Sequence, residues 1–291
     1  MIRILHGSDI HFGKPHVPRV ADALQEAART LDPDIIVLSG DFTQRAKIRE
    51  YEEARRFLDA LPDIPRVVTP GNHDVPLYRG WERALSPLRN YKRYIHPDLD
   101  VVTRIEGATF VSLNSAAPYT AIVNGRVLAR QVAFAREAFA ASPRGDLRFV
   151  VVHHALVPAP DGEDDRPLAG AGRVVDALAD MEVEMVLSGH LHRGFVASSR
   201  DVRPHGPHRE FLIVHSGTTT SNRGRVREAG RQSLNLVLID DTAIQVHHYS
   251  YVESAGGFVP DIVHAYPRGA ASYFSADAAL DAVPSSTSDV R

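Results

Sequence analysis

The sequence of 291 residues predicts an α/β fold in which helices cover the faces of a β-sheet. Short apolar runs alternate with segments whose apolar residues recur at helical spacing, and this alternation is typical of a sheet with helices on its faces. The apolar runs end in glycine, serine or asparagine, as buried strands do when they reach a turn. No repeat or linker interrupts the pattern, so we expect a single domain over residues 1–275 and a flexible, polar tail over residues 276–291.

The first part of the chain predicts strands and helices in strict alternation. The expected strands cover residues 2–5, 35–38 and 67–68, and the expected helices cover residues 20–31 and 51–61. Each helix carries its apolar residues on one face, as Val20, Leu24 and Leu31 show. The strand 35–38 is a continuous apolar run, which indicates burial on both faces.

The rest of the chain repeats this theme more loosely. Two strands, 101–105 and 109–113, are expected to pair around the turn Glu106-Gly107. Further strands are expected at residues 149–152, 185–187, 195–198, 211–215, 234–239 and 244–249, and helices at residues 132–139 and 174–178. The last two strands are separated by Asp240-Asp241 and predict a hairpin.

The composition excludes several classes of protein. The chain has no cysteine, which excludes disulfides, zinc ribbons, iron–sulfur clusters and a cysteine nucleophile. Its formal net charge of −3 gives no overall attraction to nucleic acid, so a nucleic-acid partner is not favoured. The sequence has no apolar run of about 18 residues and no signal-peptide pattern at its start, so we expect no membrane span and a cytoplasmic location.

Side chains that bind metals follow five of the expected strands. They are Asp9 and His11, then Asp41, then Asn72 with His73 and Asp74, then His153 with His154, and finally His190 with His192. Because ligands bind beyond the carboxyl ends of strands in α/β sheets, these five segments are expected to converge. A single Gly-Asp pair usually forms only a turn, but the whole series predicts a metal centre. Carboxylate and imidazole ligands suit manganese, iron or zinc.

In this order, the motifs Asp-x-His, Gly-Asp, Gly-Asn-His-Asp, His-His and Gly-His-x-His resemble those of the calcineurin-like metallophosphoesterase superfamily. The resemblance covers residues 9–192 and continues through the strand pairs to about residue 251. It implies a four-layer α/β/β/α sandwich of two mixed β-sheets flanked by helices. It also implies a centre of two divalent metal ions at the strand ends, which would hydrolyse phosphoesters through a metal-bridging hydroxide.

The resemblance further implies a role for each residue of the series. Asp9, His11 and His192 would hold the first metal, Asn72, His153 and His190 would hold the second, and Asp41 would bridge the two. His73 would be a catalytic histidine that binds no metal, and Asp74 would orient it. Two carboxylates facing two divalent ions would leave a net charge of about +2, which attracts phosphate.

The segment after residue 113 resembles the class III cyclic nucleotide phosphodiesterases. In that branch an Asp-Ser pair precedes Gly-x-Leu-x-x-x-Gln, and this chain has Asn114-Ser115 followed by Gly125 and Gln131. The resemblance implies a small substrate, either a cyclic nucleotide or a generic phosphodiester, and leaves a homodimer open. Asn114 in place of aspartate, and Ala155 in place of the usual proline, leave the exact substrate open.

Several alternatives remain open from the sequence. A nuclease or a phosphomonoesterase would use the same centre, and a scaffold protein on the same fold would not use it for catalysis. His73 argues against the UDP-diacylglucosamine pyrophosphatases, which have arginine there, and Asp74 argues against the serine/threonine phosphatases, which have glutamate. The roles of His154, His215 and the arginine-rich segment 223–231 are also left open, with a solvated loop favoured for the last.

Overall fold

The computed structural model of the protein describes residues 1–121, 123–160, 165–206, 209–269 and 273–274. Within these residues the strands form two six-stranded sheets, each with parallel and antiparallel pairs. The tail expected over residues 276–291 lies outside the described residues. Among the helices that the structure describes, none has the length and apolar character needed to cross a membrane.

The first sheet has the strand order β12-β11-β10-β1-β2-β3. Its strands are β1 (Ile2–Gly7), β2 (Ile35–Leu38), β3 (Arg66–Val68), β10 (Ser233–Ile239), β11 (Ala243–Val252) and β12 (Gly257–Pro267). β1, β2 and β3 are parallel to one another, whereas β10 is antiparallel to both β1 and β11. Helices α1 (Pro18–Thr30) and α2 (Ile48–Ala60) connect the parallel strands, as parallel pairing requires.

The second sheet has the strand order β4-β5-β6-β7-β9-β8. Its strands are β4 (Val101–Ile105), β5 (Ala108–Ser112), β6 (Leu147–Val151), β7 (Met185–Ser188), β8 (Phe195–Ser198) and β9 (Leu212–His215). β4 and β5 form the expected antiparallel hairpin, and β5, β6, β7 and β9 are parallel. Its helices are α5 (Ala129–Ala140), α6 (Ala171–Asp180) and the short α7 (Ser199–Val202).

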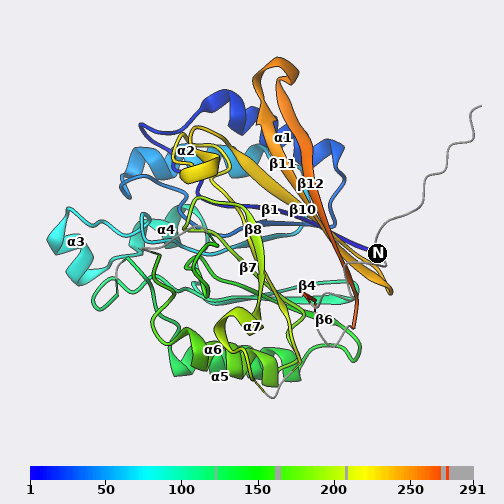
Figure 1. The fold of residues 1–291 in the computed structure, drawn as a ribbon. Coiled ribbons are helices and arrows are strands. Elements are labelled where there is room, and N and C mark those ends of the chain that lie inside the picture. Colours follow the sequence, from blue (N-terminus) through cyan, green and yellow to red (C-terminus); the bar gives the residue numbers. More distant parts are fainter. Residues whose placement is uncertain (122, 161–164, 207–208, 270–272, 275–291) are drawn as a thin grey trace, which may run out of the picture.

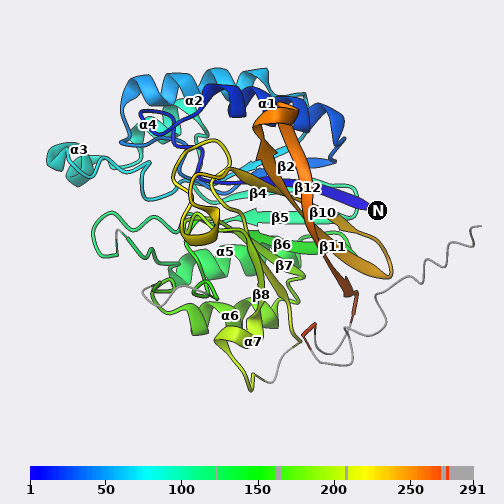
Figure 2. The same ribbon diagram turned by 45° about the horizontal axis from the view of Figure 1, so that its top comes forward.

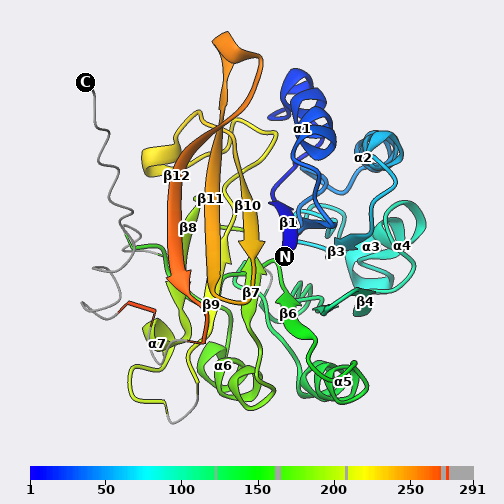
Figure 3. The same ribbon diagram turned by 90° about the vertical axis from the view of Figure 1, so that its right-hand side faces the viewer.

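The two sheets pack against each other and helices cover their outer faces. Figure 1 shows α1 and α2 above the strands and α5 and α6 below them, and Figure 2 shows the same layers after a turn of the molecule. Figure 3 shows β10, β11 and β12 side by side, with the hairpin between β11 and β12 extending beyond the sheet. The predicted four-layer α/β/β/α sandwich is therefore confirmed.

Strand β2 shows why the apolar runs are continuous. Its residues Ile35 and Val37 lie in the core between the sheets, whereas Ile36 and Leu38 lie in the core beneath α1 and α2. All four side chains are at most 1% exposed, so an unpaired polar side chain would be costly at either face. Burial of each such side chain contributes roughly 1.5–3 kcal/mol to folding. This packing holds the carboxyl ends of the strands in fixed positions.

Every predicted strand and helix is present, but the sequence did not predict all elements. β12 was missed because Pro260 interrupts its apolar run, and proline is tolerated there only because β12 is the edge of its sheet. The pairing with β11 shifts register between His248 and Tyr249 at this proline. The short helices α3 (Gly80–Leu85) and α4 (Arg89–Tyr94) were also missed.

Candidate metal centre

Loops that follow β1, β2, β3, β6 and β7 meet at the carboxyl ends of these strands. They carry every residue that the motif series singled out. The loops bond to one another within and between the sheets. The Asp9 backbone N–H donates to the Gly40 carbonyl at 3.0 Å, and the His190 N–H donates to Asp9 Oδ2 at 2.9 Å. Loops distant in sequence are thereby fixed side by side.

A first group of potential metal ligands contains Asp9, His11, Asp41 and His192, whose ligand atoms lie within 4.8 Å of one another. His192 Nε2 lies 3.0 Å from Asp9 Oδ1 and 3.1 Å from His11 Nε2. Asp41 Oδ2 is 3.7 Å from His11 Nε2. All four side chains are buried, so water does not screen their charges from one another.

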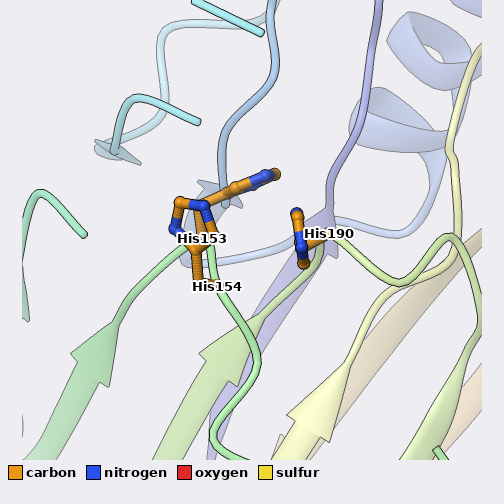
Figure 4. Close-up of side chains that lie close together, drawn as sticks. All are labelled: His153, His154 and His190. Carbon is orange, nitrogen blue, oxygen red and sulfur yellow. The ribbon is translucent and has the colours of Figure 1, made fainter. Parts of the chain in front are cut away.

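A second group lies on the other side of Asp41. Figure 4 shows His153 and His154 after one strand and His190 after its neighbour, and their ligand atoms lie within 4.8 Å of one another. Asn72 Oδ1 is 3.2 Å from His153 Nε2 and 3.0 Å from His190 Nδ1. Asp41 Oδ2 is 3.4 Å from His153 Nε2, so one carboxylate oxygen faces both groups.

Two of the imidazoles are held by backbone carbonyl groups. His153 Nδ1 donates to the carbonyl of Ser39 at 2.8 Å, and His192 Nδ1 donates to the carbonyl of Arg223 at 2.9 Å. A carbonyl only accepts hydrogen bonds, so Nδ1 carries the proton and the lone pair of the neutral ring is on Nε2. In each ring Nε2 faces the group, which is the orientation of a metal-binding histidine.

The residues fit a pair of metal cations. Asp9 Oδ1 and Asp41 Oδ2 are buried and have no hydrogen-bond partner among the described residues. Buried carboxylate oxygens without partners are costly, and a cation would satisfy them. Burial raises the pKa of Asp9, but His192 and His11 outweigh this effect and hold the pKa well below its usual range.

The charge of Asp41 has the matching effect on its neighbour. Burial lowers the pKa of His153, but the nearby Asp41 carboxylate outweighs it and raises the pKa to about 9. His190, without such a close carboxylate partner, has its pKa lowered to about 3 by burial and by His153. The carboxylates of the centre therefore stabilise a positive charge on His153, whereas protonation of the His190 ring is disfavoured.

The backbone turns sharply at the proposed ligands. Five of them have positive φ angles, namely Asp9, His11, Asp41, His190 and His192. Only nine non-glycine residues in the described part of the chain have positive φ, so most of this strained backbone lies in the centre. The sequence contains no direct signal for these angles, although Asp and His adopt them more readily than most residues.

Two motif glycines allow the loops to approach closely. A Cβ atom at Gly71 would overlap Asp41 Oδ1 and lie 2.6 Å from the Asp41 backbone nitrogen. A Cβ atom at Gly189 would overlap Ser8 Oγ and lie 2.6 Å from Asp9 Oδ2. The glycines of Gly-Asn-His-Asp and Gly-His-x-His are thus required because a carboxylate of the first group occupies the space of a side chain.

His73 lies beside the first group, and its ring is held from one side. Its centroid is 4.9 Å from that of His11, and its backbone N–H donates to Asp41 Oδ1 at 2.8 Å. His73 Nδ1 donates to the carbonyl of Gln44 at 2.8 Å. In the neutral ring the lone pair is therefore on Nε2, the atom available for proton transfer.

Asp74 was expected to orient the His73 ring, but in the structure its carboxylate bonds to other groups. The Asp74 carboxylate accepts hydrogen bonds from the backbone N–H groups of Gly71, Phe42 and Thr43 and from the Thr43 hydroxyl. Burial and the charge of Asp41 raise the pKa of Asp74 to about 7. Asp74 thus fixes the loops after β2 and β3, while Gln44 makes the contact with the His73 ring.

Residues beyond the motif ligands complete the surroundings. His154 Nδ1 lies 2.8 Å from Ser115 Oγ, while its Nε2 has no hydrogen-bond partner in the described chain. Gln131 donates to the Asn114 carbonyl at 2.8 Å, so the expected Asn-Ser and Gln positions hold one loop against His154. His215 is buried, stacks on Phe195 and contacts Ser188, which is a packing role.

Comparison with known proteins identifies one matching family and one relative that is similar in sequence. Residues 2–194 match the sequence model of a family described as calcineurin-like phosphoesterase. A Synechococcus protein named probable cyclic nucleotide phosphodiesterase is 25% identical over 166 residues. The aligned part is 56% of this chain and 60% of the relative, so the chain spans less than two thirds of that protein.

Solved structures are similar in fold. A purple acid phosphatase from yellow lupin (Lupinus luteus) seeds has a TM-score of 0.59 and 11% identity, covering 90% of this chain and 53% of that chain. GAP50 of Plasmodium, the anchor in the inner membrane complex, has a TM-score of 0.56 and 15% identity, covering 90% and 87%. At these identities the likeness concerns the fold alone.

Proposed function

The chain belongs to the calcineurin-like phosphoesterase family, and from this premise we propose that it is a dinuclear-metal-dependent phosphohydrolase that cleaves phosphodiester bonds. The observation that carries this proposal is the convergence of two groups of ligand atoms on the Asp41 carboxylate. The name of the Synechococcus relative favours a diester, either a cyclic nucleotide or a generic phosphodiester.

We assign the residues around Asp41 to two metal sites. Asp9, His11 and His192 would hold one ion, Asn72, His153 and His190 would hold the other, and Asp41 would serve both sites. The nitrogen and oxygen ligands suit manganese, iron or zinc. When bound, two such ions supply Lewis acidity, lower the pKa of a coordinated water and hold phosphoryl oxygens.

The side chains of the protein then set the charge and move the proton. Asn72 contributes a neutral amide oxygen, so Asp9 and Asp41 are the only carboxylates among the seven assigned ligands, and a positive charge of about two remains for the phosphate. In its doubly protonated form His73 donates the Nε2 proton to the leaving oxygen and returns to the neutral ring, while the Gln44 carbonyl holds Nδ1–H. Loss of His73 should lower kcat by roughly 10²–10⁴.

The test compares the wild type with His73→Ala and Asn72→Ala on three substrates. These are bis(p-nitrophenyl) phosphate, p-nitrophenyl phosphate and 3′,5′-cyclic AMP, each with Mn²⁺ and with EDTA. His205→Ala is the matched control, because His205 is exposed and lies away from the centre. Metal content is measured for every variant, so that loss of an ion is distinguished from loss of a proton donor.

We expect diester turnover that EDTA abolishes, that both site variants reduce and that the control retains. Turnover of cyclic AMP would assign the chain to nucleotide substrates, and its absence would favour a generic diesterase. Turnover of the monoester alone, or no turnover with both metals bound, would overturn the proposal. Cleavage of an oligonucleotide alone, with steep salt dependence, would replace it with a nuclease.

A further inference from the structure

The segment 216–221 packs against the loop that carries Asp9. The Thr219 N–H donates to the Ser8 carbonyl at 2.9 Å, and the Thr218 and Thr220 hydroxyls donate to the carbonyls of Asp9 and Ile10, both at 2.8 Å. The threonine side chains are fully buried. The segment is therefore fixed against the loop that carries Asp9, and the residues that follow it, Asn222 and Arg223, are at least partly exposed.

Arg223 is the first arginine after this segment, and it contacts His192 and Gln44 beside the first group of ligands. Its carbonyl accepts a hydrogen bond from His192 Nδ1 at 2.9 Å. Its guanidinium Nη1 donates to Gln44 Oε1 at 3.0 Å, and the backbone carbonyl of Gln44 accepts from His73 Nδ1 at 2.8 Å. One residue thus adjoins a proposed metal ligand and the proposed proton donor.

The surroundings of the Arg223 guanidinium leave its charge without a direct ion pair in the described part of the chain. The side chain is half-buried, and among the described residues no carboxylate forms an ion pair with it. Burial lowers the pKa of Arg223, and the charges of Asp41 and Asp9 only partly offset this effect, so the guanidinium lies within electrostatic reach of both carboxylates. Its hydrogen bond to the neutral Gln44 amide orients the group and leaves most of its five N–H donors available.

We propose that Arg223 binds the substrate phosphoryl group and stabilises the charge that develops on its oxygens during hydrolysis. This inference rests on the proposed function and adds a residue outside the motif series to it. Guanidinium is suited to this role because it is always charged and presents paired donors that match phosphate oxygens. Gln44 is a positioning residue, since it touches Arg223 and His73 but carries no charge.

The first test is the substitution Arg223→Ala, measured by kinetics, metal content and phosphate binding. The contact with His192 uses the backbone carbonyl, so metal content should stay at the wild-type level. We expect kcat/KM for the diester to fall roughly 10²–10³-fold, as when one transition-state donor is removed. We also expect weaker binding of inorganic phosphate by calorimetry. Arg231→Ala, an exposed position on the same loop, is the matched control and should behave as the wild type.

Two further measurements distinguish direct contact from a structural role. Added guanidinium ion should restore part of the rate in Arg223→Ala and none in His73→Ala, and Arg223→Lys should recover part of the rate through charge alone. Gln44→Ala should lower kcat/KM by less than Arg223→Ala, and the double variant should equal Arg223→Ala, because Gln44 acts through the arginine.

The outcomes separate this inference from the proposed function. If the wild type hydrolyses diesters and Arg223→Ala retains its rate and phosphate affinity, the inference is wrong and the proposed function stands. Loss of metal from Arg223→Ala, or no response to guanidinium, would also overturn it by assigning the residue to folding. If the wild type hydrolyses none of the substrates, the proposed function fails, and phosphate affinity alone then decides whether Arg223 binds the phosphoryl group.

Discussion

Asn72 is the one proposed ligand whose side chain has a neutral amide, and its Oδ1 faces both His153 and His190. The substitution Asn72→Asp keeps the size and adds a negative charge. We expect metal to be retained but the positive charge of the centre to decrease, with kcat for the diester falling at least tenfold, equivalent to about 1.4 kcal/mol. Metal analysis and steady-state kinetics check this, and an unchanged kcat with both metals bound would show that the neutral ligand has no catalytic value.

At the scale of single residues, the sequence could single out side chains that bear chemistry but not the groups that orient them. Asp41 and His153 stand out because carboxylates and imidazoles follow apolar strands. Ser39, Gln44 and Arg223 orient rings through backbone carbonyls, which every residue has and which leave no sequence signal. The metal-binding roles themselves stay predictions until metal is measured.

The loop after β7 shows how an element sets the geometry of the centre. Gly189→Ala would place a methyl group against Ser8 Oγ and 2.6 Å from Asp9 Oδ2. We expect this overlap to cost roughly 1–3 kcal/mol and to reduce metal occupancy, because the Asp9 carboxylate must shift to make room for the methyl group. Gly80→Ala is the control, since Gly80 has no atom within 4 Å of the added methyl and lies in helix α3.

Metal titration followed by calorimetry and thermal unfolding checks both glycine variants. Equal metal affinity in Gly189→Ala and Gly80→Ala would contradict the argument.

At the scale of elements, the sequence predicts those that are buried on both faces, such as β2, because their apolar runs are unbroken. It does not predict β12, where edge position rather than composition permits Pro260, nor the positive φ angles that aim the ligands.

For the whole molecule, a core shared by both sheets favours the single domain over residues 1–275, which stays a prediction. Phe110 of β5 stacks on Phe149 of β6 with centroids 4.5 Å apart, within the core that also contains Ile4 and Val237 of the first sheet. We expect one calorimetric unfolding transition, which Phe110→Ala should shift as a whole by about 3–5 kcal/mol. The control Trp81→Ala should shift it little, since Trp81 is 83% exposed. Two separate transitions would contradict a single domain.

The stability of the metal-free molecule should also fall in acid because several of its histidines are buried. Burial and the neighbouring rings of His264 and His247 together lower the pKa of His248 to about 4, against the opposing charge of Asp261. The unfolded chain takes up a proton on this ring near pH 6.5 and the folded chain does not, so stability is lost as the pH falls from 6.5 towards 4. His6 and His215 have pKa values lowered to about 3 for the same reason.

The substitution His248→Phe isolates one of these rings, because the His248 side chain has no hydrogen bond within the described chain and phenylalanine has no proton to bind. In EDTA, the difference in unfolding free energy between wild type and variant should change by up to about 3 kcal/mol between pH 6.5 and pH 4, in favour of the variant at low pH. Urea unfolding at a series of pH values measures this difference. A difference that stays constant with pH would mean that His248 is protonated in the folded state, and that its burial does not contribute to the acid sensitivity of the fold.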